Sequence, residues 1–345
     1  MNAFTGFIIL TLLFGFIISP SRDCYRKKIY VYIESVLLLF IATFRSNYTS
    51  DMVRYSINFQ RVASNSWSDA FHEKFHTGLY VFIKLISVIS NNIHFIYFIL
   101  SFLFVYAVGK LIYKYSVDPI LSYLMLIPMG YFAFTLTGIA QGMSMALVIL
   151  ALLSLNDGNI LHFCIFVVLA TFFHTSALIA FLLILNRYIK FNYYSCLFIA
   201  VMYSVIYIFK YHIGSFLITQ TSYRDYTVKV SDGGFFELLI YLVILIGSIF
   251  VLKNDVRENS KIKSLVYSCL LGVIFFTFVP ILTEFFRIAL YFNVFVIILL
   301  PEIINRYTFN NLKDKIIVNV IVYICFLLEY FGFTYASSSM NLYTC

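Results

Sequence analysis

Long apolar stretches separated by short polar segments dominate this chain. A helix that crosses the hydrocarbon core of a bilayer needs roughly 20 predominantly apolar residues. Stretches of this kind occur near 3–19, 29–44, 78–92, 93–113, 119–136, 138–155, 161–185, 193–209, 235–252, 264–281, 282–301 and 316–335. Because lipid offers no hydrogen-bonding partner to an open backbone, each stretch is expected to be helical. The pattern therefore predicts an all-α, polytopic integral membrane protein with about twelve transmembrane helices.

The composition supports this prediction and removes several classes of function. Of the 345 residues, 62% are hydrophobic and 12% are charged, and the mean hydropathy is +0.91. Soluble chains carry roughly 45–50% apolar and about 25% charged residues, so a water-soluble protein is excluded. The six cysteines lack the spacing of a zinc site or a disulfide framework. Glycine-rich nucleotide loops, a D-x-D pair and G-x-S-x-G are also missing, which disfavours a P-loop or Rossmann enzyme and a nucleotide-sugar glycosyltransferase.

The basic residues indicate an orientation in the membrane rather than nucleic-acid binding. The net charge is +8, and cytoplasmic loops of membrane proteins are enriched in Lys and Arg. The first apolar stretch has no basic residue before it and the cluster 22–28 after it, which is typical of an uncleaved helix with its N-terminus outside. Strict alternation then places three further basic segments in the cytoplasm. They are Asn186–Lys190, Lys253–Lys263 and Asn305–Lys315.

The chain is interpreted as one transmembrane domain, residues 1–345, without internal repeats. The same alternation puts its two longest loops, 45–77 and 210–234, outside. Lys110 and Lys114 disagree, because they also fall outside. A re-entrant or half-length segment between residues 78 and 155 would change this parity.

The first long loop opens on a cluster of charged and aromatic residues. Arg45 is followed by Asp51, Arg54 and Tyr55. On a helix, Asp51 would share a face with Arg54, three positions later, and with Tyr55, four positions later. Guanidinium groups can bind a phosphate bidentately and keep a neighbouring carboxylate ionised. The cluster predicts an anion-binding site, and the alternative is an interfacial salt bridge that fixes the loop.

Two polar groups lie inside apolar stretches. His174 is deep in the 161–185 stretch, and its imidazole could exchange a proton near neutral pH. The alternative is a histidine that hydrogen-bonds a neighbouring helix. Gln141 lies in the small-residue element 138–144, for which close helix packing is the default explanation.

Two later segments complete the candidate site. Glu284 and Arg287 have the i, i+3 spacing of an ion pair within one helix, and Tyr291 continues that face. The pair could serve insertion alone, or Arg287 could present its charge to an anionic lipid-linked substrate. In the second long loop, Arg224 and Tyr226 suit a sugar-binding surface, although an ordinary solvated loop has the same composition.

At these residues the chain resembles the EpsG-like branch of the Wzy polymerases, which polymerise O-antigen and exopolysaccharide repeat units. The resemblance covers most of the length. The matching elements are Phe44, Arg45, Asp51 and Tyr55; Gly138, Ile139 and Gln141; Phe173, His174, Ser176 and Ala177; and Arg287, Tyr291 and Phe292. One position departs from the family, which usually has Arg immediately before that Gln, where this chain has Ala140. If that arginine contacts diphosphate in relatives, the role passes here to Arg45, Arg54 or Arg287.

The resemblance implies a bundle of the GT-C-like, O-antigen polymerase–ligase type in the bacterial inner membrane, with its active site facing the periplasm. A growing glycan would move from undecaprenyl diphosphate to the non-reducing end of a new lipid-linked repeat unit. Donor and acceptor would thus both be undecaprenyl-diphosphate-linked glycans. Neither metal nor cofactor is needed, because the diphosphate is already an activated leaving group. Dependence on a polysaccharide chain-length regulator is left open.

The resemblance also suggests roles for the candidate residues. Arg45, Arg54 and Arg287 would bind the diphosphate. Asp51 or His174 would be the base, and Glu284 would orient groups beside it. The remaining predicted substrate contacts are Tyr55, Gln141, Arg224, Tyr226 and Tyr291.

Three other functions remain as alternatives. Asp51-Met-Val-Arg54 weakly resembles the Asp-x-x-Arg start of a family of membrane O-acyltransferases, but that start normally opens the first span. A lipid-linked oligosaccharide flippase would usually show internal pseudo-repeats. The ligase that moves finished glycan shares the polymerase's chemistry, and sequence does not separate the two.

Overall fold

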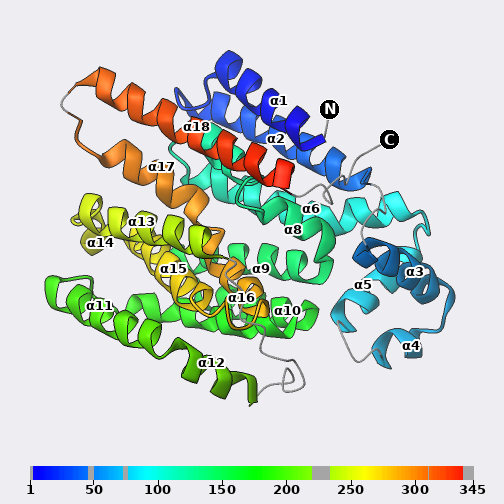
Figure 1. Ribbon diagram of the computed structural model, residues 1–345. Helices are drawn as coiled ribbons and strands as arrows, with labels where there is room; N and C mark the ends of the chain where they lie inside the picture. The colour runs from blue at the N-terminus through cyan, green and yellow to red at the C-terminus, as the bar shows by residue number, and fades with distance from the viewer. Residues whose placement is uncertain (1–2, 46–49, 73–76, 220–233, 310, 337–345) are drawn as a thin grey trace. The chain divides into compact units, whose positions relative to one another are not determined.

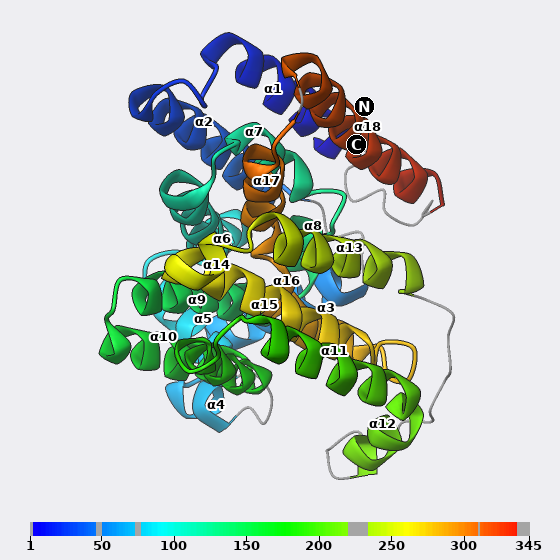
Figure 2. The same cartoon turned by 90° about the vertical axis from the view of Figure 1, so that its left-hand side faces the viewer.

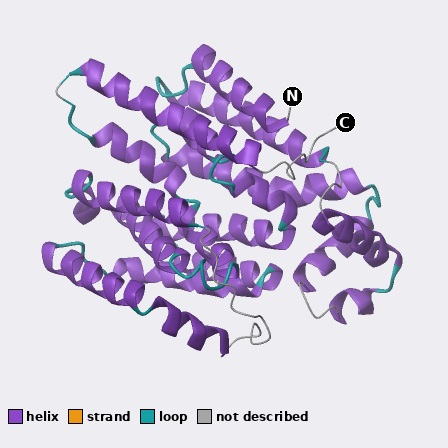
Figure 3. Cartoon of the chain, in the orientation of Figure 1, coloured by secondary structure: helices purple, strands orange, loops and turns teal. Residues whose placement is uncertain are grey.

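The computed structural model describes residues 3–45, 50–72, 77–219, 234–309 and 311–336. Within these ranges every regular element is a helix, which confirms the all-α prediction (Figure 3). The chain forms two compact units. The first comprises Met1–Ser154, Asn159–Leu178 and Thr308–Cys345, and the second comprises Leu155–Gly158 and Ile179–Tyr307.

Figure 1 labels most of the helices, and α9 and η1 contribute residues to both units. In chain order, those up to η1 are α1 (Ala3–Ile18), α2 (Cys24–Thr43), α3 (Ser50–Ser64), α4 (Trp67–His72), α5 (Thr77–Ser87), α6 (Ile93–Tyr115), α7 (Pro119–Met125), α8 (Tyr131–Thr137), α9 (Ile139–Asn156), α10 (Ile160–Phe173) and the 3₁₀ helix η1 (Thr175–Arg187). The second unit continues with α11 (Tyr193–Ile208), α12 (Lys210–Thr219), α13 (Phe235–Val251), α14 (Asp255–Glu258), α15 (Ser260–Phe276), α16 (Glu284–Asn293) and α17 (Val296–Arg306). The first unit ends with α18 (Leu312–Ala336).

The polar breaks between apolar stretches supply helix caps. Asp23, Asn92, Asp118, Asn159 and Asn259 each accept a hydrogen bond from a backbone N–H in the first turn of the helix that follows. Such bonds satisfy backbone donors that have no partner inside the helix. The short polar segments therefore set where the helices begin.

Three described helices are long and apolar enough to cross a membrane: α6, α9 and the Leu312–Gly332 part of α18. Two bent pairs would raise the number to five if each pair is one span. They are α11 with Lys210–Phe216, bent by 72°, and α16 with α17, bent by 47°. Shorter apolar helices of 10–17 residues include α1, α5, α10, η1 and α13. A membrane protein is thus supported, whereas the count of about twelve spans stays a prediction.

Helices α2 and α6 pack against each other and run in opposite directions. At one end, Lys27 Nζ donates to the carbonyl oxygen of Ser116, just beyond α6. At the other end, His94 Nδ1 donates to the carbonyl oxygen of Thr43, at a distance of 2.9 Å. The start of α2 therefore lies beside the end of α6.

This antiparallel arrangement resolves the disagreement over Lys110 and Lys114. Both belong to the last turns of α6, so they lie at the same end of the pair as Lys27. Helix α5 has 11 residues and is about 16 Å long, too short for a hydrocarbon core of about 30 Å. The prediction that 78–92 crosses the membrane as a full helix is therefore wrong.

Other predicted stretches are broken. The 119–136 stretch forms α7 and α8, and the intervening turn contains Gly130 at φ 72°, a conformation that favours glycine. The 161–185 stretch breaks at His174, whose backbone is extended at φ −149° and ψ 115°. The predicted loop 45–77 carries α3 and α4, and α12 occupies the start of the predicted loop 210–234.

A hydrogen bond shows where the chain goes after α9. Arg187 Nη2 donates to the carbonyl oxygen of Leu155, at a distance of 3.3 Å. The segment between these two residues therefore begins and ends at the same place. Residues 161–185 therefore do not form a single straight crossing, because such a crossing would place Leu155 and Arg187 on opposite sides of the membrane.

Buried polar contacts hold α1 and α18 within the first unit, where these helices lie side by side (Figures 1 and 2). Thr11 Oγ1 on α1 donates to Glu34 Oε2 on α2, at 2.8 Å, and Tyr30 donates to the Thr11 carbonyl oxygen. The hydroxyls of Thr5 and Tyr330 lie 2.8 Å apart. Glu34, an acidic residue inside the predicted 29–44 stretch, is thereby part of a helix contact.

In the second unit, α15 packs closely against α16. A Cβ at Gly272 would overlap the side chain of Asn293, which is fully buried. At the end where α14 meets α17, Arg306 pairs with Asp255 at 2.6 Å, and Lys261 pairs with Glu302 at 3.1 Å. Asp255 and Glu302 are thus already paired with basic residues.

Candidate functional site

One hydrophobic cluster in the first unit lies beside several residues of the predicted site. It joins α3, α5 and α6 to the start of α9, and Phe173 at the end of α10 packs against it. Its buried members include Phe59, Tyr80, Tyr97 and Ala140. Helix ends that carry polar candidates are thus brought to one place by apolar packing.

Arg45 is the most deeply buried of the predicted phosphate ligands. It follows α2, and its side chain is 2% exposed. Its guanidinium carbon lies 3.9 Å from the centre of the Tyr97 ring, and Nη1 donates to Ser101 Oγ at 3.4 Å. A planar guanidinium can stack on an aromatic face in this way, whereas a lysine ammonium lacks the plane. The permanent charge is therefore fixed in a region where its field is weakly screened.

Asp51, Arg54 and Tyr55 lie on α3, as the predicted helical spacing requires. Arg54 is exposed, and the Tyr55 ring contacts Phe59 of the hydrophobic cluster with centroids 5.8 Å apart. The Asp51 side chain falls outside the described part of the structure. The structure thus gives α3 one solvent-accessible cation and one tyrosine next to the core.

Helix α5 supports α3 and α10. Lys84 Nζ donates to the carbonyl oxygens of Ala63 and Asn65 at the C-terminal end of α3, at 2.8 and 2.6 Å. At the other end of α5, Gly78 lies so close to α10 that a Cβ would overlap the Phe172 carbonyl oxygen. The short helix therefore fixes both neighbours, and Lys84 gains a structural role that the sequence did not indicate.

His174 lies where α10 ends. Its Nδ1 is 2.7 Å from Ser176 Oγ, and the preceding ring, Phe173, packs edge-on against Phe82 of α5. The hydroxyl engages Nδ1, so proton transfer by this imidazole would use Nε2. The Phe-His-x-Ser element thus forms a small polar junction beside the hydrophobic cluster.

Gln141 is in the first turn of α9 and is 2% exposed. Gly142 next to it allows close packing, because a Cβ there would lie 2.9 Å from Thr135 Cβ. Ser144 Oγ donates to the Ala170 carbonyl oxygen of α10, at 2.7 Å. The helix-packing interpretation of this element is consistent with these contacts. The neighbouring cluster members Ala140 and Met143 place Gln141 at the same end of α9 as the cluster.

The second unit carries the late candidates on α16. Glu284 is half-buried, and its Oε2 accepts a hydrogen bond from Thr283 Oγ1 at 3.3 Å. Arg287 is exposed, whereas Tyr291, one turn later, is completely buried. Arg287 is therefore accessible to a ligand, and Tyr291 contributes to the core. Arg224 and Tyr226 lie outside the described residues.

Sequence reasoning missed the partners that hold Arg45. Tyr97 and Ser101 are four residues apart on α6, so they form a short polar stripe on an otherwise apolar helix. Asn58 and Tyr80 were also missed, and their side chains hydrogen-bond at 3.3 Å. Among the described residues, no group of three or more His, Cys, Asp or Glu side chains gathers as a metal site would require.

These features define a polytopic helical membrane protein with a buried cation and an imidazole beside one core. The chain belongs to the EpsG family, whose model matches residues 28–345. Membership supports a polysaccharide-polymerase-like role in a membrane. No curated protein and no solved structure matches the chain.

Proposed function

We propose that the protein polymerises lipid-linked oligosaccharide repeat units by glycosyl transfer at the outer face of a bacterial inner membrane. Undecaprenyl-diphosphate-linked glycans serve as donor and acceptor. The acceptor hydroxyl oxygen bonds to the anomeric carbon of the donor, whose bond to the diphosphate oxygen breaks. The diphosphate leaves with the bonding electrons, and a base takes the hydroxyl proton. This reaction needs fixed positive charge for the leaving group and a proton acceptor for the hydroxyl.

The geometry of Arg45 carries the proposal. A guanidinium held against Tyr97 in a low-dielectric site needs little reorganisation when negative charge develops nearby. Arginine also matches phosphate oxygens bidentately. Arg54, which is exposed on α3 of the same unit, is suited to capturing the charged headgroup before reaction.

Ala140 supports the same assignment. This residue stands where the family usually has arginine, and it is 1% exposed within the hydrophobic cluster. Tyr97 belongs to that cluster, and Arg45 stacks on it. A guanidinium is thus supplied to the cluster from the end of α2 instead of from the start of α9.

His174 is the proposed base, and Asp51 is the alternative. The Ser176 contact orients the imidazole, a group that commonly serves as a general base in enzymes. The sidedness of the chain agrees with an external reaction. Arg45 follows the end of α2 away from Lys27, and His174 is midway along a segment whose two ends meet near Arg187.

The proposal is tested by replacing Arg45 in the native host and analysing surface glycan as a ladder on a gel. Arg45→Ala should leave the protein in the membrane and reduce the glycan to single repeat units, because losing one such donor costs about 10²–10³ in rate. Arg45→Lys should restore little, since lysine keeps the charge without the stacked plane. Arg22→Ala removes an exposed arginine after α1 and should give a normal ladder.

A normal ladder from Arg45→Ala, at wild-type protein level, would overturn the assignment of this residue. Deletion of the gene separates the other functions. An intact ladder with altered acetyl content would identify an acyltransferase, complete loss of surface glycan a flippase, and free polymer on the lipid carrier a ligase.

A further inference from the structure

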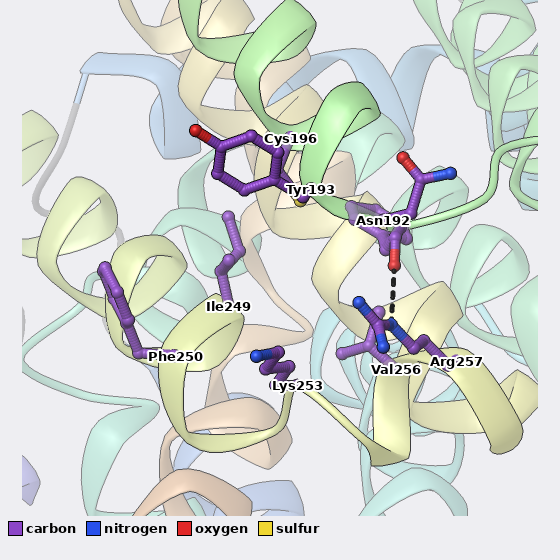
Figure 4. Close-up of a pocket in the computed structure, with 9 residues that line it drawn as sticks. Asn192, Tyr193, Cys196, Ile249, Phe250, Lys253, Val256 and Arg257 are labelled. Carbon is purple, nitrogen blue, oxygen red and sulfur yellow. Dashed lines mark hydrogen bonds between the residues drawn. The ribbon is translucent and has the colours of Figure 1, made fainter.

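A cavity of about 240 Å³ in the second unit lies between the start of α11, the end of α13 and α14 (Figure 4). Its lining combines Tyr193, Ile249 and Phe250 with two basic side chains, Lys253 and Arg257. In Figure 4 the Tyr193 ring and the Ile249 side chain lie on one side of the space and Arg257 on the other. The polymerase proposal uses none of these residues.

Arg257 is held in place, and neither Arg257 nor Lys253 is paired with the acidic groups around them. Arg257 Nε donates to the Phe191 carbonyl oxygen at 3.3 Å, which anchors the guanidinium and leaves its two Nη nitrogens to other ligands. Nearby Asp255 pairs with Arg306, and Glu302 pairs with Lys261. Within the described ranges, no ion pair joins Lys253 or Arg257 to an acidic side chain.

Further basic groups add to the positive potential at this end of the unit. Lys263 Nζ donates to the carbonyl oxygen of Arg187, at 3.4 Å. Burial lowers the pKa of Lys263, and the neighbouring Lys190 lowers it further. Basic groups that lie close together repel one another. A bound anion lowers the electrostatic energy of all of them, so the group attracts anions. These residues belong to the two basic segments that the sequence places in the cytoplasm.

The apolar side of the cavity distinguishes a lipid from a small anion. Tyr193 and Phe250 are exposed by 72% and 77%, and they adjoin the apolar surface of α13. An inorganic anion would leave the exposed faces of these rings uncovered, whereas an acyl chain would cover them. Tyrosine and lysine at a membrane interface also match the depth of a headgroup.

We propose that this cavity binds an anionic glycerophospholipid of the cytoplasmic leaflet. The phosphate lies between Lys253 and Arg257, and the start of an acyl chain lies against Ile249 and Phe250. The bound lipid fixes the end of α13 relative to α11. This inference does not depend on the polymerase proposal, since it concerns other residues and, by the charge pattern, the other side of the membrane.

The full-length protein in neutral detergent is titrated with phosphatidylglycerol or phosphatidylcholine and followed by native mass spectrometry. Wild type should bind phosphatidylglycerol more tightly than phosphatidylcholine. Lys253→Ala with Arg257→Ala should weaken phosphatidylglycerol about 10- to 30-fold and leave phosphatidylcholine unchanged. The matched control, Lys313→Ala with Lys315→Ala, removes two basic residues at the start of α18 and should bind like wild type.

Cys196, which also lines the cavity, gives a readout that needs no variant. Maleimide modification of its peptide should fall when phosphatidylglycerol is added and stay unchanged when phosphatidylcholine is added. Equal phosphatidylglycerol affinity in wild type and the double variant would overturn the proposal. So would equal protection of Cys196 by inorganic phosphate, or by phosphatidylcholine.

Discussion

Helices α9 and α18 have the same hydropathy but opposite environments. Their most apolar windows both have a mean hydropathy of 1.8. Yet 89% of the α9 window is buried inside the protein, against 11% of the α18 window. Hydropathy therefore identifies a segment that avoids water, without telling whether lipid or protein replaces the water.

Residue size explains the difference. Helix α9 carries small residues at Ala140, Gly142, Ser144, Ala146 and Ala151, all of them buried. Small residues let helix backbones approach closely, which favours contact with protein. Helix α18 exposes bulky aliphatic residues instead. They are Ile316, Ile317, Val320, Ile321, Ile324 and Leu328.

The largest expected effect comes from filling the close approach at α9. Gly142→Leu places a side chain where even a Cβ would lie 2.9 Å from Thr135 Cβ, so we expect a loss of about 3 kcal/mol or misfolding. Gly332→Leu on α18 should be neutral, because no atom lies within 4 Å of its Cβ position. Unfolding in mixed micelles titrated with SDS measures both, and equal effects would refute the comparison.

A second substitution tests which contacts hold α18 to the rest of the first unit although most of its surface is exposed. The Tyr323 hydroxyl lies 3.1 Å from both Asp118 carboxylate oxygens. Tyr323→Phe should cost about 1.5–3 kcal/mol, as expected for a hydrogen bond to a charged group. Tyr25→Phe, at an exposed tyrosine, is the control in the same unfolding assay. If both substitutions were neutral, the hydrogen bonds between Tyr323 and Asp118 would contribute nothing to holding α18.

A third, smaller effect compares the same substitution at a position that faces protein and at a position that faces lipid. Val148→Leu adds a methylene to a completely buried position on α9 and should cost about 1–2 kcal/mol. Val320→Leu makes the same change on the exposed face of α18 and should stay within about 0.5 kcal/mol of wild type. Thermal unfolding in nanodiscs would show the difference, and a reversed order would contradict the assigned environments.

The smallest effect concerns the hydrogen bond between α9 and α10. Ser144→Ala removes the 2.7 Å bond to the Ala170 carbonyl oxygen, and about 0.6 kcal/mol is expected inside a membrane. Ser204→Ala removes a bond within α11 and should change stability less. Hydrogen exchange at the end of α10 would detect the local loosening. Unchanged hydrogen exchange in Ser144→Ala would show that this hydrogen bond does not stabilise the packing of α9 against α10.

The sequence predicted the uninterrupted helices well and the broken ones poorly. The predicted spans 93–113 and 138–155 correspond closely to α6 and α9, because both are bounded by polar or small residues. Nothing in hydropathy marks the turn at Gly130 or the extended backbone of His174. Such breaks depend on tertiary contacts, for example the packing of α5 against Phe172.

The candidate residues were chosen one by one from the sequence, which gave no geometry for them. Arg45, Tyr55, His174 and Gln141 were chosen from spacing and family resemblance. In the structure, Tyr55 packs against one hydrophobic cluster, Arg45 stacks on its member Tyr97, and His174 and Gln141 adjoin Phe173 and Ala140 in the chain. The stacking of Arg45 on Tyr97 could not be foreseen, because the two residues are separated by α3, α4 and α5 along the chain. Conversely, the predicted face shared by Arg287 and Tyr291 is divided, since one is exposed and the other buried.

The hydrogen bond between Arg187 and Leu155 has a consequence for biosynthesis. The 14 residues of α10 and the 13 of η1 are each apolar, yet neither has the roughly 20 residues of a stable span. A nascent chain that has emerged only to His174 would therefore be poorly retained by lipid. Helices α10 and η1 must therefore insert into the membrane together. Insertion of this segment has to follow the synthesis of Arg187.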